Sequence, residues 1–189
     1  MKKVFILDTS AILSVQQTLT YFSKEESGEG ATFLTTPEIV TELKDSISKL
    51  RIESMISSQA LFVKDANIQY KAYIEEICKK IGNYDRLSSQ DKSIIALAWQ
   101  EKEQQESVKT VLLTDDFEIQ NTAKILKMEF RPIKTAGIRY TAKFKKMCQA
   151  CGEILLKEDT FCPECGSTKF KMKKLSYSKN RQKQPIHKS

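Results

Sequence analysis

The chain has 189 residues, of which 40% are hydrophobic and 29% charged, and its formal net charge is +7. This composition supports one folded domain of ordinary size with a small appendage, and it excludes a chain that is disordered throughout. No apolar run approaches the roughly 18–20 residues of a membrane-spanning helix, and no secretory signal peptide stands at the start. We therefore expect a cytoplasmic protein without a membrane partner.

The charge is divided unevenly along the chain. Residues 1–130 contain 16 Lys and Arg against 20 Asp and Glu, whereas residues 131–189 contain 15 against 4. A basic segment of this kind supplies affinity for polyanions through phosphate contacts and counterion release. We expect the last part of the chain to bind nucleic acid; the alternative is a solvated lysine-rich tail without a partner.

The first apolar run, Val4–Leu7, predicts a short buried strand that leads directly into Asp8. Asp8 would then lie at the carboxyl end of the first strand, where open α/β sheets bind ligands. The structural alternative is that Asp8 is only a turn residue or a cap of the helix that periodicity predicts over 11–22. A polar loop is expected over 23–30.

Apolar runs and helical periodicity predict the later elements in alternation. Strands are expected over 31–34, 61–63, 111–114 and 128–130, and helices from Thr36 to about residue 50, over 66–81, after Ser88 and over 117–127. Alternating strands and helices imply an α/β fold, a mostly parallel sheet with helices on both faces. In such a sheet, the carboxyl ends of the strands share one edge.

Acidic side chains recur near that edge: Asp8, Glu42, Asp91, Asp115 and Asp116. Some have structural alternatives, since Asp91 has capping-box spacing to Ser88 and one of the two adjacent aspartates can be an N-cap. Capping does not require the buried helix face on which Asp91 lies, and a cap needs only one of two adjacent, repelling carboxylates. For Glu38, in contrast, the helix dipole is a sufficient explanation.

Carboxylates gathered in one cleft would repel one another without a cation. Mg²⁺ or Mn²⁺ resolves this repulsion, because both take oxygen ligands and keep bound waters. Such an ion orients water and stabilises the attacking and leaving oxygens of phosphoryl transfer. The single histidine, His187, lies in the tail, so histidine-dependent catalysis is not expected. The absence of a P-loop and of a GxGxxG motif argues against a nucleotide-dependent enzyme.

Four segments resemble, in order and spacing, the acidic motifs of PIN-domain ribonucleases: ILDTSAIL, TPEIVTEL, LSSQDKSIIALA and VLLTDDFEIQNTA. The resemblance covers roughly residues 3–131 and implies a metal-dependent endonuclease that leaves a 3′-hydroxyl and a 5′-phosphate. The metal-binding carboxylates that it implies are Asp8, Glu42, Asp91 and Asp116. Asp115 is the ambiguous neighbour, because the last motif of the family usually reads Thr-x-Asp. Ser10 and Asn121 match polar positions near the active site of the family.

Four of the five cysteines form two C-x₂-C pairs, Cys148 with Cys151 and Cys162 with Cys165, each followed by glycine. Four thiolates at this spacing suit one tetrahedral Zn²⁺ with no open position, so the site is expected to be structural. A module of about 25 residues cannot fold on an apolar core alone, and metal binding would supply the folding free energy. A rubredoxin-like iron site and two redox-active pairs are the alternatives. We expect Phe161 to pack around the metal.

Basic residues flank the cysteine module on both sides, with aromatic residues interleaved that suit stacking on unpaired bases. The candidate RNA-binding residues are Arg139, Lys143, Lys145, Lys146, Lys169, Lys171, Lys173 and Lys174. We divide the chain into a PIN endonuclease domain (1–131), a basic linker (132–146), a zinc ribbon (147–172) and a basic, disordered tail (173–189).

A PIN domain followed by a zinc ribbon resembles the Nin-one-binding-protein family of ribosome-assembly endonucleases, in its compact archaeal form. The resemblance covers about residues 1–172. It implies cleavage of precursor small-subunit ribosomal RNA at the mature 3′ end. Ribosomal RNA, the pre-small ribosomal subunit and other assembly factors would be the partners. The alternatives are a PIN-domain ribonuclease that acts on other RNA and a non-catalytic RNA-binding assembly factor, against which the four occupied acidic motifs argue.

Overall fold

The computed structural model describes residues 2–14, 31–105, 107–134, 137–138, 141–156 and 158–178, with the backbone alone at 141–143 and 175–178. The chain divides into two compact units, Met1–Gly137 and Ile138–Ser189. The predicted loop over 23–30 lies outside the described residues, as does most of the helix predicted over 11–22. No helix in the described ranges is long and apolar enough to cross a membrane.

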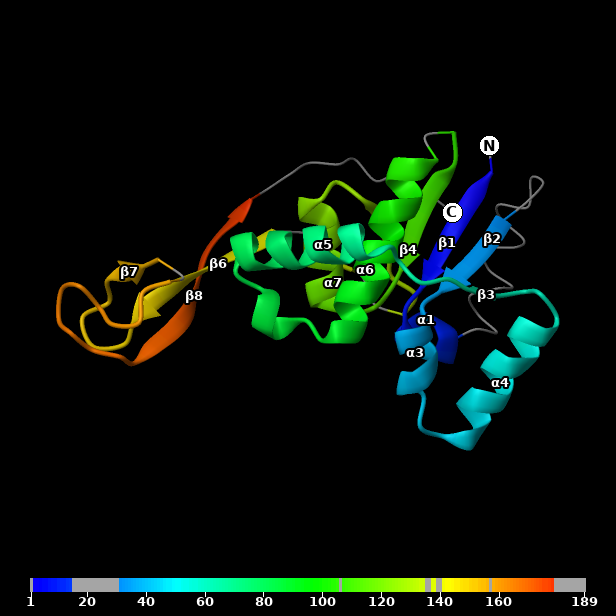
Figure 1. Cartoon of the computed structure of the whole chain (residues 1–189), viewed down its shortest axis with the longest axis horizontal. Coiled ribbons are helices and arrows are strands. Elements are labelled where there is room, and N and C mark those ends of the chain that lie inside the picture. The colour runs from blue at the N-terminus through cyan, green and yellow to red at the C-terminus, as the bar shows by residue number, and fades with distance from the viewer. Residues whose placement is uncertain are drawn as a thin grey trace, which may run out of the picture. The chain divides into compact units, whose positions relative to one another are not determined.

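A five-stranded parallel sheet with the order β3-β2-β1-β4-β5 forms the centre of the first unit, and helices flank it (Figure 1). Its strands are β1 (Lys3–Leu7), β2 (Ala31–Thr35), β3 (Phe62–Val63), β4 (Lys109–Leu113) and β5 (Glu129–Arg131). The chain moves outward from β1 to β3 and then returns to place β4 on the other side of β1. This arrangement confirms the predicted α/β fold, and its switch point lies between β1 and β4.

The central strand β1 is apolar because it is covered on both faces. Phe5, Ile6 and Leu7 are fully buried. Leu7 pairs in register with Leu113 of β4, so the two strands end side by side. The residues that follow them, beginning with Asp8, therefore emerge at the same point of the sheet edge.

In the part of the first unit that the structure describes, the helices are α1 (Thr9–Leu13), α3 (Pro37–Glu42), α4 (Ser46–Ser57), α5 (Ile68–Ile81), α6 (Ser89–Gln104) and α7 (Phe117–Ile125), with a 3₁₀ turn at Tyr84–Arg86. Two predicted helix starts are confirmed. Thr36 accepts a hydrogen bond from the Ile39 N–H at 3.5 Å, and Ser88 and Asp91 form a reciprocal capping box. These caps place α3 and α6 at the sheet edge where β1 and β4 end.

The helix expected from Thr36 to about residue 50 is two helices. The first of them, α3, ends at Glu42. The Asp45 carboxylate then caps the second, α4, by accepting a hydrogen bond from the Ser48 N–H at 2.8 Å. Ile47 and Leu50, whose apolar spacing extended the predicted helix to about residue 50, are 64% and 66% exposed. Because α4 begins at its own cap, Asp45, the apolar spacing that starts in α3 does not predict which face of α4 is buried.

The second unit contains a three-stranded antiparallel sheet with the order β7-β6-β8. Its strands are β6 (Thr141–Cys148), β7 (Ile154–Leu155) and β8 (Phe170–Ser178). β6 includes residues assigned to the linker, and β8 includes 173–178, which were assigned to the tail. Composition alone suggested a solvated tail, but pairing with β6 from Cys148 to Thr141 organises this lysine-rich backbone as a strand.

Candidate active site and metal centre

Asp8 is the buried carboxylate of the candidate active site. It is 5% exposed and follows β1 directly. The hydroxyls of Thr114 and Ser10 donate hydrogen bonds to its Oδ2, at 2.8 Å and 3.1 Å. Thr114 follows β4, so this contact joins the ends of the two central strands. Asp8 occupies the N-cap position of α1, but its side chain makes no capping hydrogen bond. Capping therefore does not explain the burial of this carboxylate.

The protein environment only partly compensates the charge of Asp8. Burial raises the pKa of Asp8 above its ordinary value, because desolvation disfavours the carboxylate. Hydrogen bonds from Thr114, the Thr9 N–H and Ser10 lower this pKa, while the charge of Asp91 raises it further. A cation bound beside Asp8 would supply the missing stabilisation of the charged form.

Asp91 and Glu42 approach the same edge from two helices. Asp91 lies in the first turn of α6, where its Oδ2 accepts a hydrogen bond from the Ser88 N–H at 2.8 Å. It is therefore a helix cap, and its charge also reaches Asp8. Glu42 ends α3, and its Oε2 accepts a hydrogen bond from Thr9 Oγ1 at 2.6 Å. Because Thr9 follows Asp8, this bond holds Glu42 beside the end of β1.

Asp115 and Asp116 have different surroundings. Asp115 Oδ1 accepts hydrogen bonds from the Ile133 and Lys134 N–H groups at 2.9 Å and 3.0 Å, and its Oδ2 accepts a third from Lys134 at 3.1 Å. Asp116 caps α7 through Oδ1 alone, which accepts from the Glu118 and Ile119 N–H groups. Asp116 is exposed, so it retains an oxygen for a ligand, whereas Asp115 uses both to anchor the chain after β5.

Ser10 connects the two strand ends, because its Oγ donates to Asp8 and accepts from the Asp115 N–H at 3.0 Å. Asn121 is 5% exposed on α7. Thr9 and Thr114 are site residues that were not predicted as such. The sequence feature that could have indicated them is a hydroxyl residue directly after an apolar strand, as Thr114 is, or after the carboxylate that ends one, as Thr9 is. This feature shows which carboxylate each hydroxyl binds only once the order of the strands is known.

The acidic residues supply oxygen donors alone, which suits Mg²⁺ or Mn²⁺. Within the described ranges, no three of these carboxylates lie close enough together to form a group that could hold a metal ion by itself. An ion enclosed by protein ligands would need closer donors. The arrangement therefore fits a cation that keeps several of its waters and binds the protein through one or two carboxylates directly.

The four cysteines form a compact cluster in the second unit. All four Sγ atoms lie within 4.8 Å of one another, and Cys148–Cys165 and Cys151–Cys162 are each 3.5 Å apart. Tetrahedral Zn²⁺ with bonds of about 2.3 Å requires sulfur separations of about 3.8 Å. The donor set and its spacing therefore fit one zinc ion.

Each cysteine pair closes in a tight turn. Gly152 and Gly166 have φ values of +83° and +71°, and their N–H groups donate to the carbonyls of Cys148 and Cys162. The Cys151 N–H lowers the pKa of Cys148 to about 6, although burial opposes this effect. The pKa of Cys151 rises to about 12, because the neighbouring thiols and burial outweigh the Glu153 N–H that lowers it. Four thiolates therefore need a cation to coexist.

Comparisons with known proteins decide the family. A model described as the PIN domain of ribonuclease matches residues 5–100. The endoribonuclease Nob1 of Methanocaldococcus jannaschii is 33% identical over 184 residues, which cover 96% of this chain and 84% of that protein. Endoribonuclease Nob1 of Pyrococcus abyssi is 33% identical over 135 residues, which cover 70% of this chain and 79% of that protein. The chain belongs to the Nob1 family of PIN-domain endoribonucleases.

A solved structure agrees with the fold of this Nob1-family chain. The structure of VapBC-1 from nontypeable Haemophilus influenzae is similar with a TM-score of 0.50 and 11% identity, covering 70% of this chain and 99% of that chain. This likeness shows a shared fold. The matched PIN segment, 5–100, includes Asp8, Glu42 and Asp91, and the two aspartates after β4 follow it.

The predicted RNA-binding lysines of the ribbon differ in their surroundings. Lys145 of β6 lies directly opposite Lys173 of β8, and both are exposed. Like charges directly opposite each other destabilise a sheet, so a polyanion would relieve this pair. Lys146 is engaged within the ribbon, since its Nζ donates to the Asp159 carbonyl at 2.5 Å and lies 4.1 Å from the centroid of the Phe170 ring.

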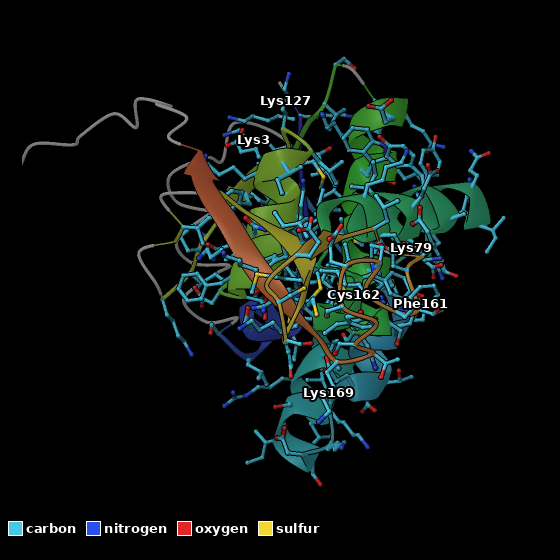
Figure 2. All side chains as sticks on the ribbon, turned by 90° about the vertical axis from the view of Figure 1, so that its left-hand side faces the viewer. Lys3, Lys79, Lys127, Phe161, Cys162 and Lys169 are labelled. Atoms are coloured by element: carbon cyan, nitrogen blue, oxygen red, sulfur yellow. The ribbon has the colours of Figure 1, made fainter. Side chains whose placement is uncertain are left out.

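Lys169, Lys171 and Lys174 are also exposed, whereas Arg139 lies outside the described residues and the side chain of Lys143 is not described. Phe161, expected to pack around the metal, is 59% exposed and projects away from Cys162 (Figure 2). That expectation was wrong, because Leu155 and Phe170 cover the buried cysteines instead.

Proposed function

We propose that this chain cleaves precursor small-subunit ribosomal RNA at its mature 3′ end during ribosome assembly in the cytoplasm. Asp8, Glu42, Asp91 and Asp116 would together hold Mg²⁺ or Mn²⁺, one or two of them directly and the others through its bound waters. The observation that carries the proposal is the buried Asp8 carboxylate where β1 and β4 end, with Glu42 bonded to the next residue and the charge of Asp91 acting on it, in a member of an endoribonuclease family. The geometry favours Asp116 over Asp115, since backbone N–H groups occupy both oxygens of Asp115.

A divalent cation bound at this edge would orient the attacking water and offset charge on the phosphate. The protein prepares that position: Thr114 and Ser10 fix the Asp8 carboxylate, and Thr9 fixes that of Glu42. In the reaction, the water oxygen bonds to phosphorus while the bond from phosphorus to the 3′ oxygen breaks. A carboxylate accepts a proton of the water, and the departing 3′ oxygen gains a proton. The products are a 3′-hydroxyl and a 5′-phosphate.

The second unit supplies the RNA affinity that an acidic site lacks. Residues 131–189 contain 15 basic and 4 acidic residues, and exposed lysines lie on both long strands of the ribbon. Contacts between these lysines and phosphates would hold the RNA independently of its sequence. The structural zinc ion would keep β6 and β8 in register, so that the lysines present one basic surface.

The test is cleavage of an RNA that spans the 3′ end of small-subunit ribosomal RNA, with Mn²⁺ and with mapping of both product ends. We expect one cut at the mature end, and none with Asp8→Asn. Cleavage without site preference would favour a ribonuclease that acts on other RNA. Binding without cleavage under every divalent metal would favour a non-catalytic assembly factor. Unchanged activity of Asp8→Asn would refute the mechanism.

A further inference from the structure

Glu38 has a role that its position in the first turn of α3 does not suggest. Its Oε1 accepts a hydrogen bond from Lys71 Nζ of α5 at 2.9 Å, and its Oε2 accepts one from Ser93 Oγ of α6, also at 2.9 Å. Both oxygens therefore contact other helices. A side chain that served only the dipole of its own helix would need neither contact.

Through Ser93, Glu38 joins its own helix, α3, to α6, and each of these two helices carries a carboxylate assigned to the active site. Glu38 precedes Glu42 by one helical turn on α3, and Ser93 follows Asp91 by two residues on α6. Ser93 is 4% exposed, so its hydroxyl has little access to water as an alternative partner. The bond between Glu38 and Ser93 thus spans the gap between α3 and α6 close to both acidic residues.

Lys71 keeps this bridge ionised and in place. It binds Glu38 on one side and Asp65 Oδ1, at 2.6 Å, on the other. Burial raises the pKa of Glu38, but the hydrogen bonds from Lys71 and Ser93 lower it more, so the carboxylate stays charged. A charged acceptor makes a shorter and stronger hydrogen bond to a hydroxyl than a neutral one does.

We propose that Glu38 is a positioning residue that, with Ser93 and Lys71, sets the separation between Glu42 and Asp91 for divalent-cation binding. This inference rests on the proposed function for the roles of Glu42 and Asp91. Glu38 touches neither metal nor RNA and acts through the two helices. Residues that orient metal ligands typically change metal affinity or activity by about 10-fold to 100-fold when they are replaced.

The experiment compares Glu38→Gln and Ser93→Ala with the wild-type full-length chain. Mn²⁺ affinity is measured by calorimetry, kcat and KM by RNA cleavage, and folding by thermal denaturation. We expect each variant to weaken Mn²⁺ binding and lower kcat by about 10-fold or more, with the KM for RNA unchanged. The double variant should be little worse than either single one, because Ser93→Ala removes, and Glu38→Gln weakens, the same bond between Ser93 and Glu38. Glu76→Gln is the control, since it breaks an exposed pair with Lys80 on α5.

Two results separate this inference from the nuclease assignment. Wild-type Mn²⁺ affinity and kcat in Glu38→Gln and Ser93→Ala, with only a lower melting temperature, would overturn the inference and leave the nuclease intact. A wild-type chain that neither binds Mn²⁺ nor cleaves RNA would refute the proposed function, and this inference with it. Losses of the same size in Glu76→Gln would also overturn the positioning role.

Discussion

Removal of zinc should unfold the second unit while the first stays folded. Among the described residues of the second unit, the buried cluster consists of Leu155, Cys148 and Cys162, with Phe170 packed on it, and Met147 is also buried. Burial of an apolar side chain of this size contributes about 1.5–3 kcal/mol. A structural zinc site contributes about 10–16 kcal/mol at neutral pH. The metal therefore outweighs the apolar core, and a fold with so few buried side chains should not survive its loss.

The single tryptophan allows the two units to be followed separately. Trp99 lies on α6 of the first unit, with its ring stacked 5.5 Å from that of Tyr73. We expect a chelator to leave the Trp99 emission and its melting transition unchanged. Backbone amide NMR signals from β6 and β8 should move to random-coil positions, and Cys162→Ser should reproduce this result.

Cys78→Ala is the matched control, because this buried cysteine of α5 lies outside the cluster. It should keep one zinc per chain and instead lower the stability of the first unit by about 1 kcal/mol or more. Dispersed signals from β6 and β8 after complete removal of zinc would refute the reasoning. Loss of zinc in Cys78→Ala would refute the assignment of the ligands.

Three further predictions concern the carboxylates and the ribbon. Because burial raises the folded-state pKa of Asp8, its stabilising contribution is complete below its unfolded pKa and is lost as pH rises through the folded pKa. Asp8→Asn should therefore raise the melting temperature of the metal-free protein at pH 7 but not at pH 3. It should also abolish the increase in melting temperature that Mn²⁺ gives the wild type. A melting temperature below that of the wild type at pH 7 would contradict this account. Asp116→Asn should lower kcat while α7 stays capped, since asparagine also caps helices. Asp115→Asn should mainly lower thermal stability. Equal losses of kcat in the two variants would show that both residues serve the metal. Joint replacement of Lys145 and Lys173 by alanine should flatten the salt dependence of RNA binding by about 0.7 per lost phosphate contact, and an unchanged slope in filter-binding titrations would exclude such contacts.

Features with a local cause could be predicted from the sequence. The run Val4–Leu7 predicted the central strand, because a strand buried on both faces must be apolar without alternation. Thr36 and Ser88 marked helix starts, since caps act within one turn. The four cysteines predicted a metal site in the same way, because each C-x₂-C pair of ligands lies within one local turn.

Contacts between distant segments could not be predicted in this way. Ser93 meets Glu38 across 55 positions of the chain, and Thr114 meets Asp8 across 106. Glu38 was therefore explained by its own helix, although its partners lie on two others. The apolar period through Leu50 suggested one long helix, because periodicity does not register the competing cap at Asp45.

The buried and half-buried acidic residues separate into two groups according to what compensates their charge. Glu101 is 2% exposed and pairs with Lys64 at 2.6 Å, and Glu38 pairs with Lys71. Asp8 is nearly as buried, yet within the described ranges no lysine or arginine nitrogen lies within 4.0 Å of its carboxylate. Hydroxyl donors fix its orientation without neutralising it. A carboxylate kept for structure would gain stability from a lysine partner, whereas one that must hold a cation cannot already be paired with one.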